Sequence, residues 1–379
     1  MTQELCRHRA WVEIDHQAIA HNVGEIKKLL SPNTQLMAVI KADAYGHGAT
    51  SIAKTLLAQG VSCLAIATLS EGIELREAAI ESPILVLGAL NTAEEVKTLL
   101  HWGLEPTLCS LQQALVFSQT AQQHKAILPV HVKIDTGMSR LGIAPENTLD
   151  FVRLIESLPA LKLSSLYSHF ATADDPNSAT MYLQKSHFEQ AIQSLTKAQI
   201  EIPTLHMANS AATLSDSNLH YDLVRVGLSL YGLYPANHLQ SKISLDAALQ
   251  VKARITQLKW VKAGTGISYG HQFISNRPMQ IATVGIGYAD GVPRNLSNRL
   301  KVLLKGQWIK QIGNITMDQL MLDVTELENI EIGEVVTLIG SQGNLSISAQ
   351  DWAEQLGTIS WEILCGFKHR LPRVNLLAD

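Results

Sequence analysis

The residue best suited to covalent chemistry is Lys41, which directly follows the apolar run at residues 36–40. The run predicts a short buried strand, and glycines at positions 46 and 48 predict a turn after it. Burial lowers the proton affinity of a lysine and makes its amine a nucleophile that can form a Schiff base. The alternative is a lysine whose stem lies along the strand end while its ammonium group reaches water. This stretch alone supports both interpretations equally.

Further polar side chains lie on later predicted strands, at or near the points where those strands end. They are His131, Lys133, Asp135, His169, His206, Asn209 and Arg225. The first three alternate with apolar residues, so they share one face of their strand. One such residue would mean little, but buried polar groups need partners. Together with Lys41, these residues indicate a common site.

The elements that would position these residues alternate regularly between strand and helix. Strands are predicted at residues 36–40, 63–68, 84–88, 105–108, 128–135, 161–169, 204–208 and 223–231, with helical patterns between them. Their number and spacing favour a (β/α)8 barrel over an open sheet. In such a barrel, active-site groups lie at the carboxyl ends of the strands, where the polar residues are found.

From about residue 249 the helical periodicity fades, and short strands punctuated by Gly and Asn follow, with one amphipathic helix at 349–356. The predicted fold is therefore α/β. It has an N-terminal (β/α)8 TIM barrel at residues 12–246 and a C-terminal, mostly β domain at residues 247–379. The sequence leaves open whether residues 1–11, with the strand-like segment 10–14, join the second domain.

Composition excludes several classes of protein. At 379 residues, with 46% apolar and 17% charged residues, the chain can form two folded domains. A net charge of -4 gives no reason to expect a nucleic acid partner, and no apolar run approaches a membrane span. The four cysteines form no CxxC pair and the histidines no HExxH, so we expect neither disulfides nor a metal. The N-terminus lacks a signal-peptide core, so we expect a cytoplasmic protein.

The loops after the last two predicted barrel strands have features of a phosphate site. Ser210 could cap a helix whose free N–H groups face an anion. Gly227 would let the backbone approach a ligand closely. Either residue alone is better explained as an ordinary helix cap or a packing glycine. Together with Lys41, they match a cofactor that carries both an aldehyde and a phosphate.

Nearly the whole chain resembles the alanine racemase family. The motifs recur in the family's order: VIKADAYGHG at 39–48, VKIDTGMSRLG at 132–142, SHFATAD at 168–174, HMANSAA at 206–212, VRVGLSLYG at 224–232, ISYGHQF at 267–273, GYADG at 287–291 and ITMDQ at 315–319. The resemblance implies an isomerase that uses pyridoxal 5'-phosphate to interconvert L-alanine and D-alanine, a building block of peptidoglycan. It also implies a head-to-tail homodimer with composite active sites.

The resemblance assigns two catalytic residues. Lys41 would bind the cofactor and act as the base on the D-alanine face, and Tyr269 would be the base on the L-alanine face. Two bases are expected because one cannot easily reach both faces of the substrate. A free tyrosine keeps its proton up to about pH 10. In the resemblance His169 contacts the tyrosine, with Arg225 behind it, as a cationic relay. Without the resemblance, Tyr269 would be interpreted as a core aromatic residue.

The remaining assignments concern the cofactor and the substrate. Arg225 would face the pyridine nitrogen and, because arginine keeps its proton, would leave that nitrogen unprotonated, which favours racemisation over transamination. Arg140 would orient the substrate carboxylate, with Met317 close to the substrate. Lys133 matches a position that is carbamylated in part of the family; the alternative is a lysine paired with Asp135. The residues expected at the cofactor are Lys41, Tyr45, His169, Asn209, Ser210, Arg225, Gly227, Leu228 and His369.

Two positions depart from the family pattern. His369 stands where many members have a tyrosine at the phosphate, and Asn314 stands where many have an arginine. They leave open the tightness of the substrate pocket and the charge of the access channel. Two other functions were weighed: a broader racemase that also accepts serine, and a non-catalytic cofactor-binding barrel. Periplasmic broader racemases carry signal peptides and extra cysteines, and Tyr269 and Met317 in the β domain argue against a binding protein.

Overall fold

The computed structural model describes residues 8–376, so Cys6 and the first seven residues of the segment 1–11 lie outside the described part. The chain forms two compact units. The barrel unit comprises Ala18–Ala44 and Gly48–Asp246. The β unit comprises the residues up to Gln17, Tyr45–His47 and the residues from Ala247 onward.

Eight parallel strands form the sheet of the barrel unit, in the order β8-β7-β6-β5-β4-β3-β2-β9. They are β2 (Gln35–Val39), β3 (Cys63–Ile66), β4 (Ile84–Ala89), β5 (Glu105–Leu108), β6 (Leu128–Lys133), β7 (Leu161–Tyr167), β8 (Leu205–His206) and β9 (Leu223–Val226). Two backbone hydrogen bonds link the ends of this order: Asp222 N–H to Leu205 O at 3.0 Å and Arg225 N–H to Ala208 O at 2.9 Å. The predicted barrel is thereby confirmed.

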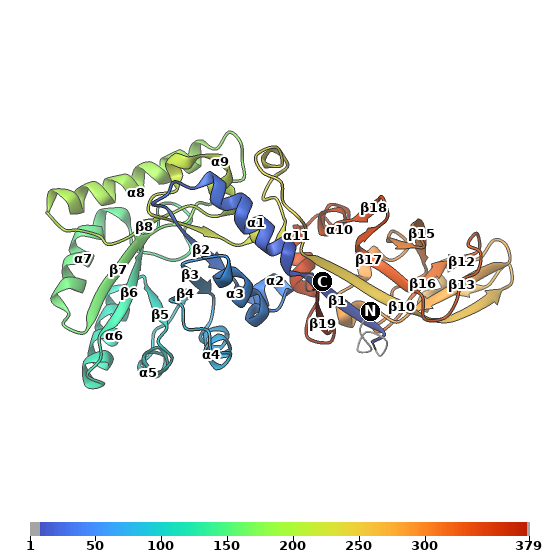
Figure 1. Cartoon of the computed structure of the whole chain (residues 1–379). Coiled ribbons are helices and arrows are strands. Elements are labelled where there is room, and N and C mark those ends of the chain that lie inside the picture. The colour runs from blue at the N-terminus through green and yellow to red at the C-terminus, as the bar shows by residue number, and fades with distance from the viewer. Residues whose placement is uncertain (1–7, 377–379) are drawn as a thin grey trace. The chain divides into compact units, whose positions relative to one another are not determined.

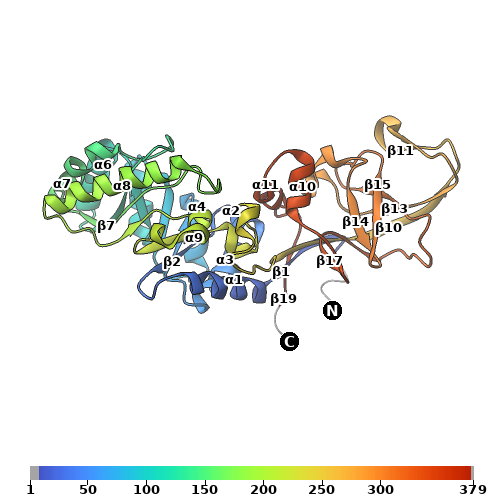
Figure 2. The same cartoon turned by 90° about the horizontal axis from the view of Figure 1, so that it is seen from above.

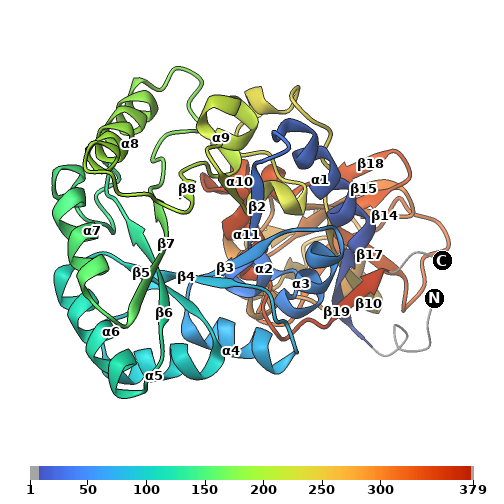
Figure 3. The ribbon, with the colours of Figure 1, turned by 60° about the vertical axis from the view of Figure 1, so that its left-hand side comes forward.

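Helices surround these strands (Figures 1 and 3). They are α1 (His16–Leu29), α3 (Ala49–Ala58), α4 (Leu69–Glu77), α5 (Ala93–Trp102), α6 (Leu111–Gln123), α7 (Thr148–Ser157), α8 (Ala179–Lys197) and the short α9 (Ser210–Ser215). Local sequence sets several helix starts, because Thr68 with Glu71 and Thr92 with Glu95 form capping boxes. Gly103, at φ 59°, ends α5.

The last barrel strand is shorter than the sequence predicted. The expected strand at 223–231 ends at Val226, and Leu228–Tyr231 form the 3-10 helix η4. The Leu230 N–H donates to Gly227 O at 2.9 Å. Because all four residues of η4 are buried, their apolar run could not be told from a strand by composition. The early end leaves the N–H groups of residues 227–229 outside the strand ladder.

The β unit contains a nine-stranded sheet in the order β18-β17-β14-β15-β16-β13-β10-β1-β19 (Figure 2). Its strands are β1 (Ala10–Asp15), β10 (Leu249–Val261), β13 (Met279–Val284), β14 (Lys301–Leu304), β15 (Gln307–Ile312), β16 (Leu320–Asp323), β17 (Val335–Gln342), β18 (Leu345–Ile347) and β19 (Arg373–Leu376). β1 pairs with β10 and with β19, so the N-terminal strand belongs to this sheet. The strand-like segment at residues 10–14 therefore joins the β unit, whereas residues 1–7 lie outside the described part.

Smaller elements complete the β unit. The short strands β11 (Gly266–Ile267) and β12 (Phe273–Ile274) form a hairpin. The helix α10 (Ala349–Leu356) has the predicted bounds, and α11 (Ser360–Gly366) follows it. Over residues 8–376, no helix is both long and apolar enough to cross a membrane. Within the same range, no group of three His, Cys, Asp or Glu side chains could hold a metal.

Candidate active site

The segment after Lys41 is a short left-handed helix, α2 (Lys41–Gly46), where the sequence predicted only a turn. Ala42, Asp43, Ala44 and Tyr45 have φ values of 53°, 53°, 52° and 56°. This conformation costs an L-residue about 1 kcal/mol or more. Four such residues in succession, none of them glycine, mark the segment after the lysine as a functional site candidate.

Specific bonds within the barrel unit hold the start of this strained segment. The Ala42 N–H donates to Glu71 Oε1 at 2.7 Å, and Asp43 Oδ1 accepts from the Ala49 N–H at 2.7 Å. The Gly48 N–H donates to Asp43 O at 3.0 Å. Glu71 belongs to the capping box of α4, so the same carboxylate that starts a helix also fixes the residue after Lys41. The sequence analysis missed this role of Glu71.

Lys41 follows β2, which is the neighbour of the strand that carries Arg225. β2 and β9 are parallel neighbours, with Met37 paired to Arg225 and Ala38 paired to Val226. The residues after both strands, including Lys41 and Gly227, therefore emerge at the same edge of the barrel. β8, which leads to Ser210, is next to β9.

His169 lies among several cations of the barrel unit. Burial lowers the pKa of His169 well below its usual value, and the positive charges of Arg225, Lys133, Arg140 and Lys41 lower this pKa further. Arg225 Nη2 donates to His169 Nδ1 at 3.1 Å, so the hydrogen of the neutral ring is on Nε2. The structure thus brings together five predicted site residues, with a net positive charge that suits an anionic ligand.

Arg225 is held from several directions and is only 3% exposed. Its Nη2 donates to Ser168 O at 2.6 Å and to Met207 O at 3.2 Å, and its Nη1 contacts His206 Nδ1 at 2.8 Å. The guanidinium carbon lies 5.1 Å from the centre of the Tyr167 ring. Burial lowers the pKa of Arg225 to about 10, so it stays protonated at neutral pH. The sequence analysis missed Tyr167, because an aromatic residue in a barrel strand is usually a packing residue.

Lys133 faces the same Tyr167 ring, with its Nζ 5.5 Å from the ring centre. Burial, followed by the charges of Arg225 and Arg140, lowers the pKa of Lys133 to about 8. Among residues 8–376 there is no ion pair between Lys133 and Asp135, the alternative considered from the sequence. Asp135 Oδ1 instead accepts from the N–H groups of Gly137 and Ser139, both at 3.0 Å.

Those bonds shape the loop that carries Arg140. The loop folds back so that the Asp135 N–H donates to Ile143 O at 2.8 Å and the Ile143 N–H donates to Lys133 O at 2.9 Å. Gly142 closes it at φ 132°, where a Cβ atom would lie 2.5 Å from the Asp135 nitrogen. The VKIDTGMSRLG motif therefore builds a tight loop that brings Arg140 back beside its own strand.

The predicted phosphate loops converge on the Ser210 hydroxyl. Its oxygen accepts from the Gly227 N–H at 3.2 Å and from the Ser229 N–H at 3.5 Å. The prediction that Ser210 caps the helix is wrong, because Asn209 caps α9 through a bond from the Ala212 N–H to Oδ1 at 3.0 Å. Ser229 Oγ is buried and has no hydrogen-bond partner in the described chain. Leu228, which stands between Gly227 and Ser229 in the sequence, is also buried. A hydroxyl, two converging N–H groups and an unsatisfied buried oxygen fit a phosphate group.

Tyr45 and His369 belong to the β unit. Burial raises the pKa of Tyr45 to about 12, so its phenol stays a donor at neutral pH. Arg373 donates to Gly46 O at 3.1 and 3.0 Å, and to Lys368 O at 2.6 Å and Leu371 O at 2.9 Å. One guanidinium therefore joins the turn after Tyr45 to the segment that holds the exposed His369, a role that sequence patterns did not reveal.

Tyr269 and Met317 also belong to the β unit, and both are exposed, by 72% and 53%. The Asn314 side chain donates to Tyr269 O at 2.6 Å, and Ser268 Oγ donates to Asn314 O at 2.7 Å. Asn314, noted from the sequence only as a departure in charge, therefore holds the Tyr269 backbone. Near Met317, a Cβ atom on Gly287 would lie 2.5 Å from Met317 O, so the GYADG motif needs glycine there.

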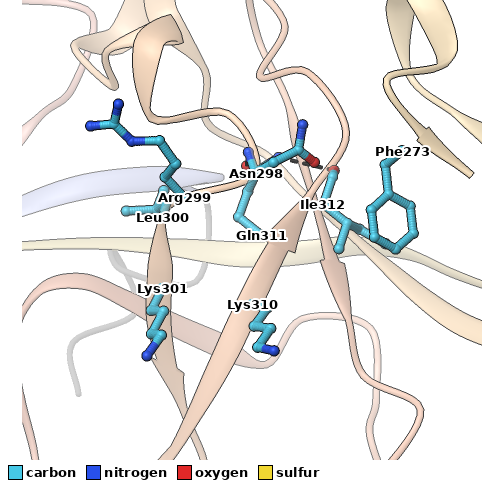
Figure 4. Close-up of a pocket in the computed structure, with 8 residues that line it drawn as sticks. All are labelled: Phe273, Asn298, Arg299, Leu300, Lys301, Lys310, Gln311 and Ile312. Atoms are coloured by element: carbon cyan, nitrogen blue, oxygen red, sulfur yellow. Dashed lines mark hydrogen bonds between the residues drawn. The ribbon is translucent and has the colours of Figure 1, made fainter. Parts of the chain in front are cut away.

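Of two pockets in the β unit, one has a predicted site residue in its lining and the other has none. One, of about 700 Å³, has Tyr269, Gly270 and His271 in its lining. The other, of about 210 Å³, contains none of the predicted site residues (Figure 4). In it, Lys301 and Lys310 extend side by side from paired strands.

The barrel unit combines a lysine, a buried arginine and phosphate-type loops at adjacent strand ends. This arrangement is typical of a barrel enzyme, and the same chain adds a β domain. Residues 14–235 match the family model for the alanine racemase N-terminal domain, and residues 248–375 match the model for its C-terminal domain. The chain belongs to the alanine racemase family and is an isomerase of that family. The predicted resemblance is confirmed.

Individual relatives agree with this family. An alanine racemase from Nostoc sp. is 58% identical over 371 residues, covering 97% of this chain and 96% of that protein. One from Synechocystis sp. is 58% identical over 370 residues, covering 98% of this chain and 100% of that protein. The solved alanine racemase of Clostridium difficile 630 is 36% identical with a TM-score of 0.93, covering 98% of this chain and 96% of that one. The Bacillus anthracis alanine racemase with bound L-Ala-P is 34% identical with a TM-score of 0.92, covering 98% and 95%.

Proposed function

We propose that this chain interconverts L-alanine and D-alanine with pyridoxal 5'-phosphate as cofactor, by a two-base mechanism in a cytoplasmic homodimer. Its D-alanine would supply peptidoglycan synthesis. The observation that carries the proposal is the convergence of Lys41, Arg225 and the Ser210 hydroxyl on three neighbouring strand ends of one barrel.

The residues of the barrel unit fit this cofactor. Lys41 would bind its aldehyde, Arg225 would face its ring nitrogen, and Ser210 with the backbone of Gly227 and Leu228 would hold its phosphate. Asn209 would support this cradle as the cap of α9. Tyr45 and His369 would contribute from the β unit, and Tyr45 stays protonated and can donate to a phosphate oxygen. When bound, the cofactor withdraws electrons from the substrate Cα and makes its proton acidic.

Lys41 and Tyr269 would move the proton on opposite faces of the substrate. The Lys41 amine would take the proton on the D-alanine face, and its ammonium form would return it. On the other face, the Tyr269 phenolate would take the proton, and its phenol form would return it. His169 supports this assignment, because Arg225 occupies its Nδ1 and its hydrogen on Nε2 can donate to a phenolate. Arg225 remains protonated and would donate to the ring nitrogen of the cofactor without giving up its proton.

Arg140 and Met317 would orient the substrate, with the Arg140 guanidinium bound to its carboxylate. We also propose that Lys133 is carbamylated. Its lowered pKa, about 8, leaves part of the amine neutral near physiological pH. The neutral nitrogen attacks the carbon of CO2 and releases one proton, forming a carbamate anion. That anion would lie among the cations of the site and replace a repulsive charge beside Arg140.

A second copy of the chain would complete the site. The support is that Tyr269 is exposed in its own unit although a base needs a sheltered position. Ile274, on the adjoining hairpin strand β12, is also exposed, by 61%. Exposed apolar groups around a catalytic side chain are expected at a surface that another chain covers.

The test is to incubate cofactor-loaded protein with L-alanine in heavy water and follow optical rotation and deuterium at Cα. We expect rotation to decay to zero while deuterium enters Cα. Bound cofactor without any loss of rotation would contradict the proposal. The same assay with L-serine measures how strictly the site selects alanine. Deleting the gene should make growth depend on added D-alanine if the product supplies the cell wall.

A further inference from the structure

A chain of side-chain hydrogen bonds crosses five neighbouring strands of the barrel. One residue of each strand takes part: Glu105 of β5, His131 of β6, Ser165 of β7, His206 of β8 and Arg225 of β9. The distances are 2.6 Å from Glu105 Oε2 to His131 Nε2, 2.6 Å from His131 Nδ1 to Ser165 Oγ, 2.8 Å from Ser165 Oγ to His206 Nε2 and 2.8 Å from His206 Nδ1 to Arg225 Nη1.

The direction of the hydrogen bonds is determined from the arginine end. A guanidinium only donates, so His206 Nδ1 must accept from Arg225 and carries no hydrogen. His206 is neutral, because burial and then the charge of Arg225 lower its pKa well below the usual value. Its one ring hydrogen is therefore on Nε2 and is donated to Ser165 Oγ.

The same direction follows from the carboxylate end. Ionised Glu105 can only accept, so His131 Nε2 carries a hydrogen. The Ser165 hydroxyl is buried, and within residues 8–376 its only hydrogen-bond contacts are His131 and His206. Since it already accepts from His206, its own hydrogen goes to His131 Nδ1. Every hydrogen in the chain thus points from Arg225 toward Glu105.

Glu105 is well placed to be the terminal acceptor. It is the first residue of β5, so it lies at the opposite end of the barrel strands from the residues that follow them. Its carboxylate is 23% exposed and acts electrostatically on Arg76 and Cys63. Arg76 itself is held by backbone carbonyls, including Trp102 O at 2.8 Å. Within residues 8–376, the short side-chain contact of the carboxylate is the one to His131.

We propose that Glu105 is a positioning residue for Arg225, acting through His131, Ser165 and His206. With an acceptor at position 105, both histidines carry their hydrogen on Nε2, and His206 presents a bare nitrogen to Arg225. Without it, His131 can move its hydrogen to Nδ1 and compete with His206 for the serine oxygen. A hydrogen on His206 Nδ1 would then face the guanidinium donor and displace it. The catalytic part of this inference rests on the proposed role of Arg225; the tautomer part does not.

Four variants test the chain in the cofactor-loaded enzyme. Glu105→Leu removes the terminal acceptor, and Ser165→Ala interrupts the chain in the middle. Glu105→Gln removes the charge but keeps an oxygen that can accept from His131. Glu81→Leu is the matched control. Glu81 also acts electrostatically on Arg76, but within residues 8–376 it makes no hydrogen bond to the five residues from Glu105 to Arg225. Nitrogen-15 NMR of histidine-labelled protein reports the tautomers, and His131→Asn and His206→Asn assign the signals.

We expect wild type, Glu105→Gln and Glu81→Leu to show both histidines as neutral Nε2–H tautomers. Glu105→Leu and Ser165→Ala should lose this pattern at His206 and shift the absorption band of the bound cofactor. Removing an outer partner that orients a functional histidine typically costs about tenfold or more. We expect kcat to fall about tenfold in these two variants, with KM for alanine within about twofold.

Two results would overturn the proposal. One is an unchanged His206 tautomer in both Glu105→Leu and Ser165→Ala. The other is a changed tautomer with unchanged kcat and cofactor absorption, which would show that the chain does not act on Arg225. A failure of the proposed function is distinguished from both, because it appears as absent racemisation in the wild type while the tautomers are still measured.

Discussion

The two units carry their site residues in opposite ways. In the barrel unit, Arg225 and Lys133 are 3% and 5% exposed, and their pKa values are lowered by burial. In the β unit, Tyr269 begins the 3-10 helix η6 (Tyr269–His271) and Met317 lies in the loop before β16, and both side chains are exposed. The barrel therefore preorganises the residues that we propose to bind the cofactor. The β unit instead presents two side chains to a surface outside its own core, as a residue supplied to a second copy would require.

The largest effect should come from removing the nucleophile of the barrel side. Lys41→Ala should lower racemisation by at least about 10⁴-fold, because one group both binds the cofactor and moves a proton. The cofactor should also leave on dialysis, which is read from its absorption. Lys97→Ala, an exposed residue of α5 paired with Glu94, is the control and should behave as wild type. Residual turnover above one per cent of wild type would contradict the assignment.

Removing the proposed base of the β unit should slow proton exchange strongly, and more from L-alanine than from D-alanine. Tyr269→Phe should slow exchange of the L-alanine Cα proton by about 10²- to 10⁴-fold, since one general base is lost. Exchange from D-alanine at Lys41 should persist, so deuterium incorporation from the two enantiomers becomes unequal. Tyr182→Phe, an exposed tyrosine of α8, should leave both rates unchanged. Equal slowing of exchange from both enantiomers would contradict the assignment of one base to each unit.

Carbamylation of Lys133 should have an intermediate effect. In buffer depleted of CO2 we expect activity to fall about tenfold and to recover with bicarbonate, because the cation beside Arg140 disorders the substrate-orienting group. A carbamate signal with ¹³C-bicarbonate, absent in Lys133→Ala, would identify the residue. An activity that does not respond to bicarbonate would contradict carbamylation.

When Lys133 is not carbamylated, its lowered pKa should also affect the stability of the folded chain. Its folded-state pKa of about 8 lies below the usual lysine value of 10.5, so between these values the unfolded chain binds more protons. The free energy of unfolding should therefore rise with pH from about 8 to about 10.5 in CO2-free buffer. Lys133→Met should remove that rise, and bicarbonate should weaken it in the wild type. Parallel denaturation curves for wild type and Lys133→Met over this range would be the contrary result.

The smallest effect should come from the support of Tyr269. Asn314→Ala removes the donor to Tyr269 O, and we expect kcat to fall about three- to tenfold, since loss of one positioning hydrogen bond costs about 1 kcal/mol. Cofactor binding should not change, because Asn314 contacts Ser268 and Tyr269, and neither residue is assigned to the cofactor. Asn344→Ala, on the exposed turn between β17 and β18, is the control. A loss of cofactor in Asn314→Ala would contradict this role and would show that Asn314 supports cofactor binding.

Much of the fold was predictable because its signals are local. The apolar strand runs and the helical periodicity predicted all eight barrel strands, and the caps of α4 and α5 lie in their own sequence. The prediction failed at residues 227–231, where a buried 3-10 helix and a strand have the same composition. It also missed the left-handed form of α2, because four non-glycine residues at positive φ run against local preference and depend on contacts such as Ala42 with Glu71.

By itself, the sequence determined the barrel pattern, the second domain and, through its motifs, the family and the site residues to expect. These are encoded in periodicity and in short motifs that act locally. Only the tertiary structure decided the partners: that Asn314 holds Tyr269, that Arg373 joins the turn after Tyr45 to the His369 segment, and that Glu105 is linked to Arg225. These pairs are distant in sequence, and hydrogen-bond partnership depends on distances of about 3 Å that only the folded chain creates.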